Sequence, residues 1–252
     1  MRKLDMARDN RWTEPWPIFA FLIRHSTGNY LVDTGDTWRN SVPGYLPKLI
    51  RDNVKVLVAP HEEIGERLKS MGLDPDKDIK SVIMSHLHHD HAGGLHHFPH
   101  SRILVSAENY KEATSLIGSK VGYLPNQWPV WFKPELFDYQ HISVGPFAKS
   151  LSITDDGAIT IVPTPGHAPG HASIIVKGSD GITYFIGADV SCSERNIRDN
   201  VADGVTWQPE LSLQTLAKVR QFASQQPTII LCSHDPINWE RMEKGQVFAK
   251  FQ

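Results

Sequence analysis

The sequence predicts an α/β protein in which two packed β-sheets carry helices on their outer sides. Strand-like runs occur in the first third and in the middle of the chain, helical segments lie between them, and one more strand follows near the C-terminus. The 252 residues contain no linker or low-complexity tract. We therefore expect residues 1–252 to form a single domain.

The predicted strands are rich in β-branched and aromatic residues. They span Pro17–Arg24, Asn29–Asp33, Ser81–Ser85, Arg102–Ser106, Ala158–Pro163, Ala172–Lys177, Ile182–Gly187 and Thr228–Cys232.

Two segments have the spacing of amphipathic helices that cover a sheet. His61–Met71 carries apolar residues at i, i+4 and i+7, and Pro209–Gln226 begins with a proline, which suits the first helical position. Tyr123–Pro134 fits neither pattern, because prolines interrupt its aromatic residues. It is interpreted as the wall or lid of a pocket, or as a packed surface loop.

Composition excludes several classes of protein. Forty per cent of the residues are hydrophobic and the formal charge is -2, so neither a membrane span nor nucleic-acid binding is expected. The two cysteines, Cys192 and Cys232, and the absence of an apolar stretch in Met1–Trp12 predict a cytoplasmic protein without a structural disulfide. Whether the chain forms a homodimer is left open.

Histidines provide the strongest signal, because seven of the 13 fall between His86 and His100. A segment that reads Ser-His-Leu-His-His-Asp-His follows the predicted strand Ser81–Ser85, at the kind of strand end where sites are built. Imidazole and carboxylate groups suit zinc and other divalent ions. The segment supplies four candidate ligands, namely His86, His88, Asp90 and His91.

Three further candidates each follow a predicted strand: His167, Asp189 and His234. Seven ligands suit two divalent metal ions, with zinc expected, that share one carboxylate. The remaining histidines of the cluster are predicted to be ordinary surface residues, namely His89, His96, His97 and His100. His171 is predicted to have a structural role.

In this order the motifs resemble those of the metallo-β-lactamase superfamily. The resemblance covers essentially the whole chain and implies an αββα sandwich of two mixed β-sheets with helices on the outer faces. It implies that Asp189 bridges the two ions and that Asp33 orients ligands rather than binding metal. It further implies one ion on His86, His88 and His167, and a second on Asp90, His91 and His234.

Within that superfamily the chain is most similar to the quorum-quenching N-acyl-homoserine lactonases, through the segments 85–94, 164–171 and 209–211. The resemblance implies a hydrolase that opens a small-molecule lactone by attack of a metal-bridging hydroxide. Asp90 is the predicted catalytic residue, which orients that hydroxide and passes its proton to the leaving group. One departure is that those lactonases place a tyrosine where this chain has Cys192, so Tyr123 is a candidate substitute donor.

Several aromatic residues could line a channel for an acyl tail, although each could equally pack in the core. The candidate substrate contacts are Trp128, Trp131 and Trp207, with Cys192 and Tyr123 beside the metals. Trp12 and Trp16 near the N-terminus could line the same channel.

A thioesterase of the glyoxalase II type, or another ester hydrolase of the superfamily, is the main alternative because it shares the seven ligands. That family resemblance would imply a basic C-terminal region, whereas only Arg241, Lys244 and Lys250 follow His234 here. A β-lactamase, which would be expected to carry a leader, and a metal-binding module without catalysis rank lower.

Overall fold

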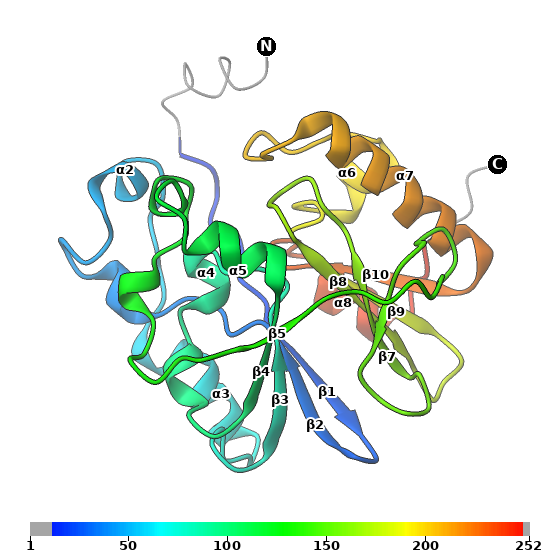
Figure 1. Ribbon diagram of the computed structural model, residues 1–252, viewed down its shortest axis with the longest axis horizontal. Coiled ribbons are helices and arrows are strands. Elements are labelled where there is room, and N and C mark those ends of the chain that lie inside the picture. The colour runs from blue at the N-terminus through cyan, green and yellow to red at the C-terminus, as the bar shows by residue number, and fades with distance from the viewer. Residues whose placement is uncertain (1–11, 249–252) are drawn as a thin grey trace. The chain divides into compact units, whose positions relative to one another are not determined.

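The computed structural model describes residues 12–248, which divide into two compact units (Figure 1). The first unit is Ile18–Phe137, and the second comprises residues 138–248 together with residues 12–17. Each unit contains one five-stranded mixed sheet, so the predicted class, two mixed β-sheets with helices, is confirmed. The single domain over residues 1–252 stays a prediction.

The sheet of the first unit has the order β1-β2-β3-β4-β5. Its first two strands form an antiparallel hairpin and all later neighbours are parallel. The strands are β1 Phe21–His25, β2 Gly28–Val32, β3 Ile79–Ile83, β4 Arg102–Ser106 and β5 Glu135–Phe137, and the helices are α2 Lys48–Arg51, α3 Ile64–Ser70, α4 His89–Ala92 and α5 Ala107–Ala113.

Parallel pairing in this unit brings the first predicted site residues together. Val32 at the end of β2 pairs with Ile83 at the end of β3. Since parallel strands end at the same edge of a sheet, the segments that begin at Asp33 and Ser85 emerge side by side.

The sheet of the second unit has the order β10-β9-β8-β7-β6, with only β9 and β10 parallel. Its core includes three mutually packed rings, those of Phe147, Phe185 and Phe222, with centroids 5.7–6.0 Å apart. The strands are β6 Leu151–Ser152, β7 Ile159–Pro163, β8 Ala172–Lys177, β9 Thr183–Ala188 and β10 Thr228–Cys232, and the helices are α6 Glu194–Arg198, α7 Pro209–Gln225 and α8 Asn238–Glu243.

All eight predicted strands are present, although the first begins only at Phe21. The predicted helix at residues 61–71 is a 3-10 turn, Pro60–Glu62, followed by α3, and the predicted helix at residues 209–226 is α7. The sequence did not predict β5 and β6, because strands of three and two residues carry too little alternation to be recognised.

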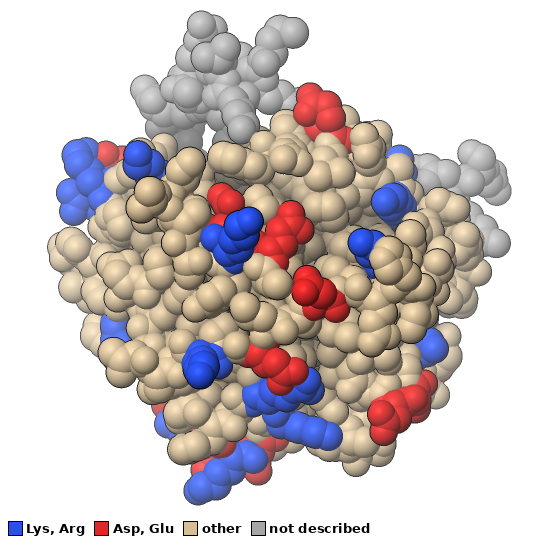
Figure 2. Space-filling model, viewed as in Figure 1, with Lys and Arg blue, Asp and Glu red and all other residues tan. Residues whose placement is uncertain are grey.

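No helix within residues 12–248 has the length and apolar character needed to cross a membrane. On the face shown in Figure 2, basic and acidic side chains are interspersed rather than separated by sign, in line with the formal charge of -2.

Candidate metal centre

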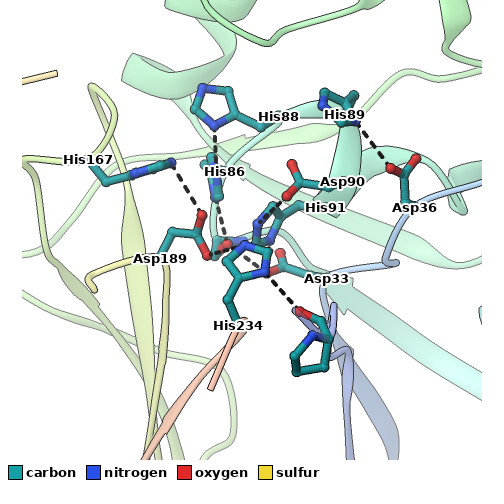
Figure 3. Close-up of polar contacts among 12 residues, drawn as sticks. Asp33, Asp36, His86, His88, His89, Asp90, His91, His167, Asp189 and His234 are labelled. Carbon is teal, nitrogen blue, oxygen red and sulfur yellow. Dashed lines mark hydrogen bonds and ion pairs between the residues drawn. The ribbon is translucent and has the colours of Figure 1, made fainter. Parts of the chain in front are cut away.

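Asp33 organises the ligands of the first unit from a fully buried position directly after β2 (Figure 3). Its carboxylate accepts hydrogen bonds from the Ser85 amide at 2.7 Å, the Ser85 hydroxyl at 2.7 Å and His91 Nδ1 at 2.8 Å. Because a carboxylate only accepts, the proton of His91 lies on Nδ1. Nε2 of His91 therefore carries the lone pair and is able to bind a metal. The orienting role of Asp33 stays a prediction.

The hydrogen bond from Ser85 to Asp33 also fixes the tautomer of His86. Ser85 donates its only hydroxyl proton to Asp33, so its oxygen accepts from His86 Nδ1 at 3.0 Å. His86 Nε2 is then the nitrogen able to bind a metal, and it lies 3.0 Å from Nδ1 of His88. Neighbouring ligand atoms on a tetrahedral zinc ion are separated by about 3.3 Å, since Zn–N bonds are about 2.0 Å long.

His88 is held by a second set of contacts. Its ring packs on that of Tyr123 with centroids 4.5 Å apart, and the two residues form an isolated β-bridge. Asn109 accepts from the Leu87 amide at 2.9 Å and donates to the Tyr123 hydroxyl at 3.1 Å. Tyr123 is thus buried and engaged from both sides, and its burial raises the pKa of its hydroxyl well above the usual range.

The glycines after the motif allow the short helix α4 to sit against the Asp33 segment. A Cβ on Gly93 would lie 2.6 Å from the Thr37 backbone nitrogen, and one on Gly94 would lie 2.4 Å from the Thr34 carbonyl oxygen. The Thr34 amide and hydroxyl both donate to the carbonyl of His91, at 2.8 and 2.7 Å. Close backbone approach explains the two adjacent glycines.

Asp90, the predicted catalytic residue, lies in α4 with its side chain partly exposed, and its carboxylate is 3.8 Å from His91 Nε2. The adjacent His89 points to Asp36 at 3.3 Å. Burial lowers the pKa of His89, but the hydrogen bond to Asp36 and the nearby Asp90 outweigh it and leave that pKa raised.

In the second unit, Asp189 lies between two histidines. One carboxylate oxygen is 3.4 Å from His167 Nε2 and the other is 3.3 Å from His234 Nε2 (Figure 3). His234 Nδ1 donates to the carbonyl oxygen of Pro17 at 2.9 Å, which fixes the proton on Nδ1. The Nε2 lone pair of His234 therefore faces a carboxylate oxygen.

Local backbone geometry positions the predicted ligands Asp189 and His167. Ala188, directly before Asp189, has φ +47°, and the register between β9 and β10 shifts at Cys232. Gly166, directly before His167, approaches α7 so closely that a Cβ there would lie 2.5 Å from Ser212 Cα. The His167 carbonyl accepts from the Trp207 amide at 3.1 Å, which anchors this loop to the segment before α7.

These donor sets fit divalent cations. A neutral nitrogen lone pair directed at a carboxylate is repulsive unless a proton or a cation lies between them. His234 with Asp189 shows this arrangement in the second unit, and His91 with Asp90 shows a looser version in the first. Imidazole and carboxylate together are the donors expected for zinc.

Cys192 is partly exposed and is followed by α6. Its amide donates to Asp203 at 2.9 Å, and Asp203 also accepts from Asn196 Nδ2 at 2.7 Å. Burial, with the neighbouring carboxylates Asp203 and Asp189, raises the pKa of the thiol well above its usual range. The thiol is therefore neutral at ordinary pH.

The predicted aromatic contacts divide into two groups. Trp128 stacks on Tyr110 and lines a pocket of the first unit; Trp131 and Trp207 are more than a third exposed, as are Trp12 and Trp16. The pocket is lined by Thr37, Arg39, Tyr45, His89, Ala92, Gly93, His96, Leu124, Gln127 and Trp128. Leu124, Gln127 and Trp128 of the irregular segment at residues 123–134 line this pocket, which favours the first of its two interpretations, a pocket wall.

Of the four histidines predicted to be ordinary surface residues, one is largely exposed and three are partly buried. His100 is exposed, but the side chains of His89, His96 and His97 are only 9%, 27% and 15% exposed. His89 contacts Asp36, and the other two converge on Glu63. Sequence reasoning missed this because the carboxylates lie far from the histidines along the chain. His171 is buried and bonded to Thr164, which agrees with a structural role.

Comparison with known proteins identifies the class. A family model described as the metallo-beta-lactamase superfamily matches residues 13–234, so the chain belongs to that superfamily.

Among similar curated proteins is the N-acyl homoserine lactonase AttM of Agrobacterium fabrum, 27% identical over 92% of this chain and 87% of its own. The N-acyl homoserine lactonase AiiA of Bacillus thuringiensis subsp. kurstaki is 26% identical over 93% of this chain and 86% of its own.

A crystal structure of a quorum-quenching N-acyl homoserine lactone lactonase has a TM-score of 0.72, with 24% identity over 92% of this chain and 84% of its own. AidC, described as a dizinc quorum-quenching lactonase, has a TM-score of 0.62. It is 16% identical over 87% of this chain and 72% of its own. These likenesses confirm the predicted fold.

Proposed function

We propose that this protein is a metal-dependent hydrolase that opens the ring of N-acyl-homoserine lactones. The observation that carries the proposal is the set of fixed tautomers: His86, His91 and His234 each have their proton on Nδ1, which leaves Nε2 for a metal. Membership of the superfamily and relatives named as lactonases support the substrate class.

We assign two divalent ions, with zinc as the expected metal, to the seven side chains identified in the sequence. The family motifs assign His86, His88 and His167 to one ion, Asp90, His91 and His234 to the other, and Asp189 to both. When bound, such ions polarise a carbonyl group and lower the pKa of water toward about 7.

Asp90 is the proton carrier of this proposal. Attack of water on the lactone carbonyl breaks the ring C–O bond, and one proton must reach the departing ring oxygen to give the hydroxy acid. The Asp90 carboxylate is held at the start of α4 with its side chain 22% exposed, so substrate and solvent can reach it. We assign it the transfer of that proton.

We propose that the acyl tail lies along apolar surface that includes Trp128. The pocket that Trp128 lines in the first unit has room for about one water molecule and is not the tail's site. The Tyr123 hydroxyl accepts from Asn109 Nδ2 and keeps its own proton for donation, so burial of the side chain, and not this bond, restricts its part in substrate binding. We expect Trp131 and Trp207 to contribute as exposed apolar surface.

The thioesterase alternative lacks the basic groups that it would need. Arg241 is buried and forms ion pairs with Glu194 at 2.9 Å and Asp235 at 3.1 Å, and Lys244 pairs with Glu240. Arg241 is therefore not available to bind glutathione carboxylates, which leaves the exposed Lys244 as the one cation after His234 within residues 12–248 that could do so. Lys250 lies outside the described residues.

A substrate panel tests the proposal. The purified protein is given an N-acyl-homoserine lactone, a glutathione thioester and a β-lactam, and the products are identified by mass. We expect the ring-opened acyl homoserine from the lactone. Turnover of the thioester with no ring-opened acid would transfer the assignment to a thioesterase.

The cytoplasm is the proposed location, and the homodimer remains a proposal to be tested by light scattering.

A further inference from the structure

Glu63, His96 and His97 form a second cluster of metal-binding groups, which no motif of the superfamily includes. All three belong to the first unit, and their ligand atoms lie within 4.8 Å of one another. His96 Nε2 is 3.2 Å and His97 Nε2 is 2.8 Å from the same oxygen, Oε2 of Glu63. The His96 separation is close to that of neighbouring ligands on a zinc ion, about 3.3 Å. The His97 separation is that of a hydrogen bond, so His97 Nε2 would have to release its proton and move back by about 0.5 Å to bind an ion.

The other oxygen of Glu63 is already occupied by protein donors. Oε1 accepts from the Thr37 hydroxyl at 2.5 Å and from the Trp38 amide at 3.0 Å. These bonds orient the buried carboxylate so that Oε2 alone faces the two imidazoles. They also favour its charged form, and the pKa of Glu63 is lowered by Thr37 and His97 against the effect of burial.

The backbone fixes the tautomer of His96. Its Nδ1 lies 3.2 Å from the carbonyl oxygen of Gly93, and a carbonyl can only accept, so the proton is on Nδ1. In a neutral ring, Nε2 is then a lone pair directed at the Glu63 carboxylate. His234 and Asp189 show the same arrangement at a predicted metal ligand.

The local sequence leaves room for the second imidazole. A Cβ on Gly65 would lie 2.3 Å from His97 Nδ1, so only glycine allows the His97 ring to reach Glu63. The two imidazole rings pack with centroids 4.0 Å apart. Two imidazolium ions at this distance would repel each other, and one carboxylate could not neutralise both.

We propose that Glu63, His96 and His97 bind a third divalent transition-metal ion, with zinc as the best match, and that a water molecule completes its coordination. Two imidazoles and one carboxylate form a recognised zinc donor set. The partial exposure of His96 leaves one side open for that water. The ion would join the segment at Thr37 and Trp38 to the start of α3 and to the 3-10 helix Leu95–His97.

We assign the third ion a structural role, which is to hold neighbouring segments of the first unit together. Thr37 and His96 both line the small pocket beside Trp128, so an ion that fixes them would stiffen one of its walls. We expect loss of the ion to lower the melting temperature.

The test counts metal ions in the full-length protein. Wild type, His97→Asn, Glu63→Gln and the control His100→Asn are stripped with a chelator, saturated with Zn²⁺ alone, desalted and assayed by elemental analysis. The control changes an exposed histidine of the same segment that pairs with Asp76 instead. We expect one ion fewer per chain in His97→Asn and Glu63→Gln than in wild type, and no loss in His100→Asn.

Equal zinc content in all four proteins would overturn the proposal. Because the result is a difference from wild type, it holds whether or not the motif residues bind two ions, and it needs no lactone. If a variant fails to fold, nitrogen-15 NMR of histidine-labelled wild-type protein tests the site without any substitution. We expect zinc to shift the Nε2 resonances of His96 and His97, whereas a zinc-saturated protein with His96 protonated on both nitrogens would show an ion pair and refute the site.

Discussion

The two units orient their predicted metal-ligand histidines by different means. In the first unit, the Asp33 carboxylate receives the Nδ1 proton of His91 and, through Ser85, governs that of His86. In the second unit, the backbone carbonyl of Pro17 receives the Nδ1 proton of His234. Both arrangements leave Nε2 for the metal, but only the first depends on a side chain.

This difference determines where the site is vulnerable to mutation. A substitution at Asp33 removes the charge and leaves buried donors without their acceptor, whereas a substitution at Pro17 retains the carbonyl. The first unit also carries Asp90, the proposed proton carrier, so the proposal concentrates proton transfer and ligand orientation in this unit. The second unit should tolerate changes to its orienting residue.

Asp90→Asn should have the largest effect on catalysis if the first unit also carries the proton. The amide keeps an oxygen near the metal but cannot carry a proton, and general acid–base groups contribute about 10²–10⁴-fold. We expect kcat to fall within that range while metal content, measured by elemental analysis, is kept. A fall of less than tenfold with full metal content would remove Asp90 from this role.

Asp33→Asn tests the orienting carboxylate. Asparagine tolerates the φ of +59° at this position, so the substitution changes charge and hydrogen bonding with little backbone strain. Metal affinity should fall about 10–100-fold, because outer partners of ligand histidines typically contribute that much. Competition with a chelator measures the metal affinity of each variant. Asp36→Asn is the control, since Asp36 contacts His89 rather than a predicted ligand, and an equal loss in both variants would contradict the account.

Cys192→Ala should have a small effect. Burial and Asp203 raise the pKa of this thiol, so it stays neutral and contributes no inflection to the pH–rate profile near neutral pH. We expect kcat/KM to change by less than about tenfold, or about 1.4 kcal/mol, with slow alkylation of the wild-type thiol. The freed space should also relax selectivity toward bulkier lactones. A hundredfold loss with intact metal, or labelling of Cys192 by substrate, would assign the thiol a chemical role.

Pro17→Ala should have the smallest effect, because the carbonyl that binds His234 is retained. We expect kcat/KM and metal affinity to change by less than about threefold, within the range of ordinary surface substitutions. A loss as large as that of Asp33→Asn would show that the proline ring, and not the carbonyl, positions His234.

The same contrast explains what the sequence could predict. Ligands of the first unit lie within residues 86–91, where histidine spacing is visible, and Asp33 follows a clear strand. Ligands of the second unit are single residues after separate strands, and only the family motifs connect them. The Pro17 carbonyl, Asn109 behind Tyr123, and Glu63 beneath His96 and His97 leave no sequence signal, because each contact joins positions distant in the chain.

Metal-dependent lactone hydrolysis is the central claim, and one measurement tests it most directly. Wild-type protein is stripped with a chelator, and Zn²⁺ is added back in steps while bound metal and ring-opened N-acyl homoserine are measured on the same samples. The account predicts that the stripped protein is inactive and that full activity requires at least two ions per chain. Full lactone hydrolysis by protein that holds one ion or fewer per chain would contradict it.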